Sequence, residues 1–266
     1  MKNTIEGKTV LITGASSGIG RHLALDLAAD GAQVILVARR IELLNGIQQQ
    51  IEQNGGKAQA IACDLADQNA RHDLIAQILS KGKPIDILVN NAGFGWYGFY
   101  QDMPEDIVKN MVEVNINAML VLTRELLPYM QARKQGQILN IGSIAGGFPN
   151  QGVAVYSASK AFMDAFTTSL HRELRGSGVN ASVIRLGPVK TEFFDSARGM
   201  QNGRRVPGEF FAISIDRATS AIKRVIIHPR RVAYIPAYLR CTRAVEFFFG
   251  GLIDTLGPLL LRKRAE

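Results

Sequence analysis

The chain has 266 residues, of which 47% are hydrophobic and 20% are charged, a balance typical of a globular protein with a sizeable core. The net charge of +8 is compatible with an anionic partner, but Lys and Arg are spread along the chain without a zinc-finger or RNA-binding motif, which argues against nucleic acid. The two cysteines, Cys63 and Cys241, have no metal-ligand spacing, so we expect neither a disulfide framework nor a bound metal.

Apolar, β-branched segments alternate along the chain with segments of helical periodicity. Strands are predicted at 8–13, 33–38, 57–64, 85–93, 136–143, 180–187 and 230–235. Helices are predicted at 20–31, 41–53, 67–80 and roughly 104–133, and a further helix carries Tyr156 and Lys160 and runs to about Arg175. This order predicts βαβ units and an α/β fold: a Rossmann-like, doubly wound parallel sheet of about seven strands with helices on both faces. We expect one domain over 1–245, followed by an apolar and basic tail at 246–266.

The N-terminal sequence is polar before it enters the first strand. It lacks the apolar core of a signal peptide, and no uninterrupted apolar run is long enough to span a bilayer. We therefore expect a cytoplasmic protein.

A glycine-rich turn follows the first predicted strand, in the sequence TGASSGIG (13–20). Glycines at this junction permit a tight turn and a close approach of the backbone to phosphate, and the helix N-terminus then offers free N–H groups. An ordinary strand-to-helix loop is the alternative. The residues predicted to bind a dinucleotide here are Gly14, Ser16, Ser17, Gly18, Ile19 and Gly20.

The end of the second strand distinguishes the two nicotinamide cofactors. An acidic residue there would bind the ribose 2′-hydroxyl of NAD, whereas arginine accommodates the 2′-phosphate of NADP. Ala38 stands at the acidic position, and Arg39 and Arg40 follow it. We predict NADP(H), with Arg39 as the main contact and Arg40 beside it; two solvated arginines at a helix start are the alternative.

Polar residues also follow the third and fourth strands. Asp64, with Leu65 after it, can accept a hydrogen bond from an adenine amino group or cap the next helix. Asn91, Ala92 and Gly93 lie in the NNAG turn, whose place beside the first glycine loop puts it near a bound dinucleotide.

The ordered set of TGxxxGxG, Asp64, NNAG, Asn115, Ser143 and the YxxxK pair of Tyr156 and Lys160 resembles the single-domain branch of the short-chain dehydrogenase/reductase family. The resemblance covers roughly residues 7–193. It implies an NADP(H)-dependent oxidoreductase that interconverts a ketone or aldehyde and an alcohol, and a homodimer or homotetramer. It also implies that Lys160 holds the nicotinamide ribose and that Asn115 takes part in a water-linked proton relay.

The catalytic set has a physical reason of its own. Tyr156 and Lys160 are four residues apart, so they lie on one face of a helix. A nearby ammonium should lower the phenol pKa from its usual value near 10, and the positive charge of an oxidised nicotinamide would act in the same direction. Ser143 can donate a hydrogen bond to the substrate oxygen. The alternatives are that Ser143 caps a short helix and that Asn115 is a polar residue satisfied within a long helix.

The segment RLGPVKTEF (185–193) resembles the PGxVxT segment of the same family, with Leu186 in the usual proline position. By this resemblance, the backbone of Val189 would meet the carboxamide and Thr191 the pyrophosphate. The departure at Leu186 leaves the backbone turn in doubt.

Two segments are predicted to shape the substrate pocket: the aromatic stretch 94–103 and a lid over about 192–211. They suggest an apolar, lipid-like or steroid-like carbonyl. The alternative is a 3-oxoacyl-carrier-protein reductase, in which Arg198, Arg204 and Arg205 would meet an acidic carrier. The tail 246–266 either packs on the protein or between subunits, which we favour, or lies on an anionic membrane.

Overall fold

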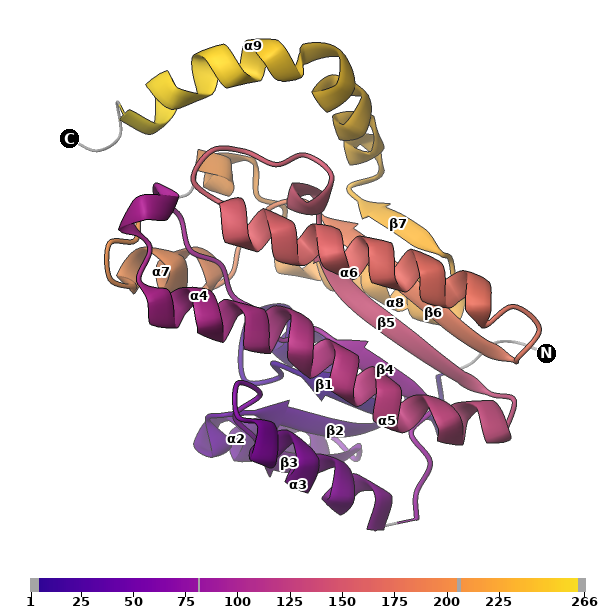
Figure 1. Ribbon diagram of the computed structural model, residues 1–266. Coiled ribbons are helices and arrows are strands. Elements are labelled where there is room, and N and C mark those ends of the chain that lie inside the picture. The colour runs from indigo at the N-terminus through magenta and orange to yellow at the C-terminus, as the bar shows by residue number, and fades with distance from the viewer. Residues whose placement is uncertain (1–4, 81, 205–206, 263–266) are drawn as a thin grey trace.

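Seven parallel strands form one twisted sheet in the order β3-β2-β1-β4-β5-β6-β7 (Figure 1). The computed structural model describes residues 5–80, 82–204 and 207–262. The strands are β1 Thr9–Thr13, β2 Gln33–Ala38, β3 Lys57–Ala62, β4 Ile87–Asn90, β5 Gly136–Ser143, β6 Val179–Leu186 and β7 Val232–Ile235. Each falls within a predicted strand or one residue from it. The order reverses between β1 and β4, where doubly wound sheets bind their ligands.

Helices cover both faces of the sheet, as expected for buried parallel strands (Figure 1). Side chains of one face pack with α1 Gly18–Ala29, α2 Ile41–Gln53 and α8 Ile215–Ile227. Those of the other face pack with α3 Gln68–Ser80, α5 Ala118–Ala132 and α6 Ala154–Glu173. The alternation along β1 shows why the strands are apolar throughout: Val10 and Ile12 belong to the first core and Leu11 to the second.

The predicted helix at 104–133 is divided in the structure. It consists of α4 Glu105–Val112, a π-helical turn η2 at Glu113–Asn117, and α5. The extra residue of a π turn shifts the following side chains around the axis, and such turns are frequent at functional sites. The turn contains Asn115, which is fully buried.

Short helices occupy the remaining connections. They are η1 Tyr100–Asp102, η3 Ile144–Gly146, α7 Phe193–Gly199, η4 Pro207–Phe211 and η5 Ala237–Cys241. The last helix, α9 Thr242–Arg262, includes most of the predicted tail and begins four residues before it. In the described part of the chain, no helix combines the length and apolar character needed to cross a membrane.

Candidate active site

A cavity of about 1020 Å³ opens at the carboxyl ends of the central strands. Every predicted cofactor-binding and catalytic residue lines it except Gly20 and Asn115. The lining comes from the ends of β2, β5 and β6, from the loops that follow β1 to β6, and from the helices beside them. The fold therefore brings residues from position 14 to position 211 to one place.

The glycine turn between β1 and α1 has the backbone that its sequence predicts. Gly14 and Gly18 have φ values of +65° and +52°, which other residues rarely adopt. A Cβ on Gly20 would lie 2.3 Å from the Gly14 carbonyl oxygen, so this glycine serves close packing and does not line the cavity. A Cβ on Gly18 would lie 3.4 Å from the Cβ of Thr191, so Thr191 closes the turn from the β6 side.

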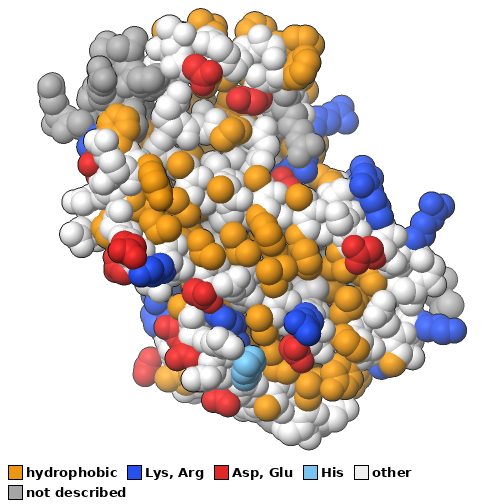
Figure 2. All heavy atoms as spheres, viewed as in Figure 1, with side chains coloured by type: hydrophobic (Ala, Val, Ile, Leu, Met, Phe, Trp, Pro, Cys, Tyr) orange, Lys and Arg blue, Asp and Glu red, His pale blue; other side chains and the backbone are white. Residues whose placement is uncertain are grey.

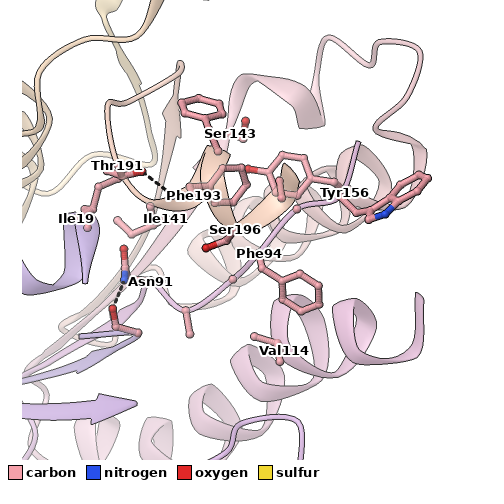
Figure 3. Close-up of a pocket in the computed structure, with 18 of the residues that line it drawn as sticks. Ile19, Asn91, Phe94, Val114, Ile141, Ser143, Tyr156, Thr191, Phe193 and Ser196 are labelled. Atoms are coloured by element: carbon pink, nitrogen blue, oxygen red, sulfur yellow. Dashed lines mark hydrogen bonds between the residues drawn. The ribbon is translucent and has the colours of Figure 1, made fainter. Parts of the chain in front are cut away.

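Thr13 and Asn91 hold the turn in place. The Thr13 hydroxyl accepts hydrogen bonds from the backbone N–H of Asn91 and of Ala92, both at 3.0 Å. The Asn91 side-chain amide donates to the Thr13 carbonyl at 2.9 Å and to the Gly14 carbonyl at 3.3 Å. Figure 3 shows Asn91 and one of these bonds. Asn91 thus acts on the shape of the phosphate loop. Sequence reasoning missed Thr13, although its place at a strand end was an available signal.

Arg39 and Arg40 are both exposed at the cavity rim. The Arg40 guanidinium donates to the Ser16 hydroxyl at 3.1 Å, which joins the end of β2 to the glycine turn. The Arg40 guanidinium and the Ser16 hydroxyl thus lie side by side, and Arg39, the predicted main contact, lines the same cavity. Guanidinium groups are donors of the kind that bind phosphate bidentately.

Asp64 remains at the cavity wall and does not cap α3. Its carboxylate accepts from the backbone N–H of Ala66 at 3.0 Å. Asp67 is the capping residue, since its carboxylate accepts from the N–H groups of Asn69 at 2.7 Å and Ala70 at 3.0 Å. The capping alternative for Asp64 is therefore wrong, and Asp64 lines the cavity. Its contact with adenine stays a prediction.

Ser143, Tyr156 and Phe193 gather at one wall of the cavity (Figure 3). The Lys160 ammonium lies 5.8 Å from the Tyr156 ring centroid and donates to the Ile141 carbonyl at 2.9 Å. Ser143 ends β5, and its hydroxyl accepts from the Ala145 N–H at 3.1 Å. Ser143 therefore caps η3, as the alternative proposed, while also lining the cavity.

The pKa values of Tyr156 and Lys160 are shifted from their usual values, and the shift of Tyr156 is opposite to the predicted one. Burial raises the pKa of Tyr156 to about 12, although the hydrogen bond with Ser143 acts in the opposite direction. Burial also lowers the pKa of Lys160 to about 8, which the Asp164 carboxylate opposes. The expected lowering of the phenol pKa by the ammonium is wrong for the protein alone, because both groups are deeply buried and desolvation dominates. At neutral pH, Tyr156 is a phenol and most Lys160 side chains are charged.

Asn115 has a satisfied side chain. Its amide oxygen accepts from the Phe94 N–H at 3.1 Å, and its nitrogen donates to the Phe94 carbonyl at 3.0 Å and to the Ser159 hydroxyl at 3.1 Å. A Cβ on Gly93 would lie 3.0 Å from the Asn115 amide oxygen and 3.5 Å from the Lys160 ammonium. Asn115 and Lys160 thus flank Gly93. The role of Asn115 in a relay stays a prediction.

Leu186 continues β6 and pairs with Ile235 of β7. After it, Val189 forms a parallel bridge with Ile213 through the Pro188 carbonyl and the Lys190 N–H, each at 3.0 Å. In a parallel ladder, the N–H and C=O of the bridging residue point away from the partner strand, so those of Val189 point away from Ile213, and Val189 lines the cavity. The structure thus retains the predicted backbone position in spite of Leu186.

The two segments predicted to shape the substrate pocket, 94–103 and about 192–211, are joined by hydrogen bonds. The Trp96 indole donates to the Gln201 carbonyl at 3.0 Å, and the Arg204 N–H donates to the Tyr97 carbonyl at 2.8 Å. Phe193 of α7 packs on Tyr156, with 5.7 Å between ring centroids. Phe193, in the first part of the predicted lid, thus covers Tyr156. Arg205, one of the predicted carrier contacts, lies outside the described residues.

A buried ion pair lies directly behind the catalytic pair and was also missed. Asp164, one turn after Lys160 on α6, accepts from the Arg185 guanidinium at 2.9 Å. Arg185 in turn lies 5.1 Å from the centroid of Tyr234 in β7. The four-residue spacing from Lys160 was the signal in the sequence.

Comparison with known proteins agrees with this geometry. Residues 8–202 match the short chain dehydrogenase family. The ketoacyl reductase HetN of a Nostoc species is 40% identical over 189 residues, 70% of this chain and 65% of that protein. The fatty acyl-CoA reductase of Acinetobacter baylyi is 39% identical over 193 residues, 71% of this chain and 65% of that protein. The chain therefore matches less than two thirds of the length of these relatives.

Solved structures share the fold over nearly the whole chain. A short-chain dehydrogenase from Sphingobium yanoikuyae, in complex with NADPH, superposes with a TM-score of 0.81 at 26% identity, over 93% of this chain and 95% of that one. With the glycine turn, the NNAG turn and the Ser-Tyr-Lys set around one cavity, these matches show that the chain belongs to the short chain dehydrogenase family.

Proposed function

We propose that the protein is an NADP(H)-dependent oxidoreductase that interconverts a ketone or aldehyde and an alcohol. One observation carries the proposal: Ser143, Tyr156 and Lys160 line the same cavity as the glycine turn and the two arginines. The catalytic domain would comprise residues 1–245, with 246–266 as an accessory tail.

The residues present fit a dinucleotide. The glycine turn leaves no room for a Cβ at Gly14 or Gly20, and the N-terminus of α1 offers its free N–H groups beside Thr191. Asp64 and Leu65 would hold the adenine, and Lys160 the nicotinamide ribose. Bound NADPH would supply the hydride.

The protein's own part is to hold the carbonyl and supply a proton. Tyr156 is protonated at neutral pH because burial raises its pKa to about 12, so its O–H can donate to the substrate oxygen. Ser143 would donate a second hydrogen bond to that oxygen, and the charged Lys160 would stabilise the phenolate that remains. As the proton leaves Tyr156, the negative charge forms next to the ammonium.

The cofactor preference rests on Arg39, Arg40 and Ser16. A 2′-phosphate placed among two guanidiniums and a hydroxyl gains charge-assisted hydrogen bonds, whereas the 2′-hydroxyl of NAD gains none of comparable strength. The ratio of kcat/KM with NADPH to that with NADH tests this; a ratio near one would contradict it.

The substrate would be apolar. Aromatic and aliphatic side chains surround the catalytic wall: Phe94, Trp96, Tyr97, Ile107, Val114, Phe148, Phe193, Phe194, Met200 and Phe211. The two relatives reported above are named as a ketoacyl reductase and a fatty acyl-CoA reductase, so both names refer to acyl substrates. We therefore propose a long-chain or otherwise lipid-like carbonyl, and a panel of aldehydes, ketones and acyl thioesters followed by NADPH absorbance tests it.

A 3-oxoacyl-carrier-protein reductase is the second candidate, because a ketoacyl reductase is among the relatives. The basic residues expected to meet a carrier are partly neutralised: Arg198 pairs with Asp195, and Arg204 lies 3.7 Å from Asp102. Kinetics with a 3-oxoacyl carrier protein and with the same acyl group as a free thioester distinguish the two candidates.

A homodimer or homotetramer in the cytoplasm completes the proposal. Hydrophobic side chains spread across the face formed by α5 and α6 (Figure 2), and Tyr129 and Phe162 are exposed there. Light scattering after gel filtration tests the assembly, and a monomeric mass would contradict it.

A further inference from the structure

The last helix, α9, lies at one side of the sheet domain and bends over its outside (Figure 1). It follows η5, and the Gln151 side chain, from the loop before α6, donates to the Ile253 carbonyl at 3.3 Å. Gln151 also lines the active-site cavity. The helix is therefore attached to the cavity rim.

The two sides of α9 differ. Glu246, Gly250 and Ile253 are half-buried and lie on one side, at helical spacing. The residues of the other side are exposed and large: Val245, Phe248, Phe249, Leu252 and Leu256. The predicted packing of the tail on the protein therefore holds for one side of this helix only.

The apolar surface extends around about half of the helix. Consecutive helical residues point about 100° apart, so the three exposed phenylalanines at 247–249 cover an arc of about 200°. Phe247 is the most exposed of them, at 81%. Between 244 and 256, the charged residues are Glu246 and Asp254, and helical spacing places both outside this arc.

Basic residues stand at both ends of this apolar helix in the sequence. Arg240 is exposed in η5, just before the helix begins. Arg262, Lys263 and Arg264 follow its apolar part in the sequence, and the chain as a whole has a net charge of +8. An apolar helix with basic flanks matches the interior and the anionic headgroups of a lipid surface.

Gln151 links the lining of the cavity to α9, and the lining also includes an exposed apolar side chain. Phe211 lines the cavity and is 79% exposed, and Gln151, on the same lining, holds α9. Hydrophobic side chains appear along the edge of the molecule where α9 lies (Figure 2). A surface that covered α9 would therefore also approach the route by which a substrate reaches Tyr156.

We propose that α9 lies in the headgroup region of an anionic lipid bilayer, so that the cavity receives an apolar carbonyl directly from the lipid. The part that concerns the substrate rests on the proposed function. A second copy of the chain is the competing occupant. A flat protein partner would cover only a narrow stripe of α9, whereas a lipid phase would cover the whole apolar half of the helix. In addition, the basic residues at the ends of α9 would repel the same residues of a second copy.

Flotation of the full-length protein with vesicles tests the proposal. The vesicles contain either phosphatidylcholine alone or phosphatidylcholine with about one third phosphatidylglycerol. We expect binding to the anionic vesicles, with a Phe248→Asp/Leu252→Asp variant bound about tenfold less. Leu43→Asp, which changes an exposed leucine of α2, is the matched control and should float as the wild type does.

If the wild-type protein does not float with anionic vesicles, the proposal is overturned, whether or not the double variant folds. If the wild type does not float and the double variant has a lower oligomeric mass than the wild type in light scattering, the proposal is also overturned. In that case α9 is an interface between copies of the chain. Unchanged mass with lost flotation supports it.

Turnover separates this inference from the proposed function. The double variant should reduce butanal in solution at the wild-type rate, but dodecanal in anionic vesicles at least about fivefold more slowly. Equal rates with dodecanal overturn delivery from the lipid. Flotation without NADPH turnover of either aldehyde overturns the proposed function and leaves the membrane contact supported.

Discussion

Lys160→Met removes a buried ammonium and keeps most of the side-chain volume. Burial lowers the pKa of Lys160 from 10.5 to about 8. At about 1.4 kcal/mol per pH unit, this difference corresponds to about 3 kcal/mol of stability lost at pH 7 by keeping the group charged in the fold. The variant also loses the hydrogen bond to the Ile141 carbonyl, worth about 1–3 kcal/mol, so the net change at neutral pH is small.

The pH dependence isolates the ammonium, since the lost hydrogen bond does not titrate. Between pH about 8 and 10.5, the unfolded chain binds more protons at this lysine than the folded chain does, so stability rises with pH there. Relative to Lys160→Met, the wild type should gain about 2 kcal/mol of unfolding free energy between pH 7 and about 9.5.

Urea unfolding of both proteins, at one protein concentration and at both pH values, measures this gain. Groups far from Lys160 titrate equally in the two proteins and cancel. A stability difference that does not change with pH would refute the reasoning, because it would mean that Lys160 is not desolvated.

Three further predictions follow from the site. Arg39→Ala and Arg40→Ala should each raise the KM for NADPH by about tenfold and leave the KM for NADH unchanged; equal effects on both cofactors would contradict the 2′-phosphate contact. Gly20→Ala should lower the free energy of unfolding by about 1–3 kcal/mol and weaken NADPH binding, because the new Cβ would lie 2.3 Å from the Gly14 carbonyl oxygen. Gly46→Ala is the control: its Cβ would meet nothing within 4 Å, so it should stabilise the protein slightly in thermal unfolding. Trp96→Phe removes the bond to the Gln201 carbonyl, worth about 1 kcal/mol, and should raise the KM for an apolar carbonyl while that for NADPH stays constant; a changed NADPH KM would place Trp96 elsewhere in the mechanism.

The strands were predictable because each is a short apolar run bounded by turn residues. The break at Glu113–Asn117 was not, because the segment contains neither glycine nor proline and its polar residues fit an α-helix. Its cause is tertiary: Asn115 bonds to both backbone groups of Phe94, and Glu113 pairs with the buried Arg71 at 2.9 Å. Such partners come from distant segments that local periodicity does not reveal.

The candidate site was predictable where a motif places a side chain at a strand end. The burial of these side chains was not predictable from the sequence. The spacing of Tyr156 and Lys160 indicates a shared helix face, whereas the direction of both pKa shifts depends on how deeply the groups are buried under α7 and the loop after β4. The Ile141 carbonyl that accepts from Lys160 is a backbone group, so no residue type could have signalled it.

NADPH oxidation by Tyr156→Phe, measured with the aldehyde or ketone that the wild type turns over best, tests the central claim most directly. The phenylalanine ring keeps the contact with Phe193 and removes the hydroxyl. We predict that kcat falls by at least about 100-fold, the usual contribution of general acid catalysis, while the Kd for NADPH, followed by cofactor fluorescence, changes little. Retention of the wild-type kcat, with NADPH bound equally well, would show that Tyr156 is not the proton donor.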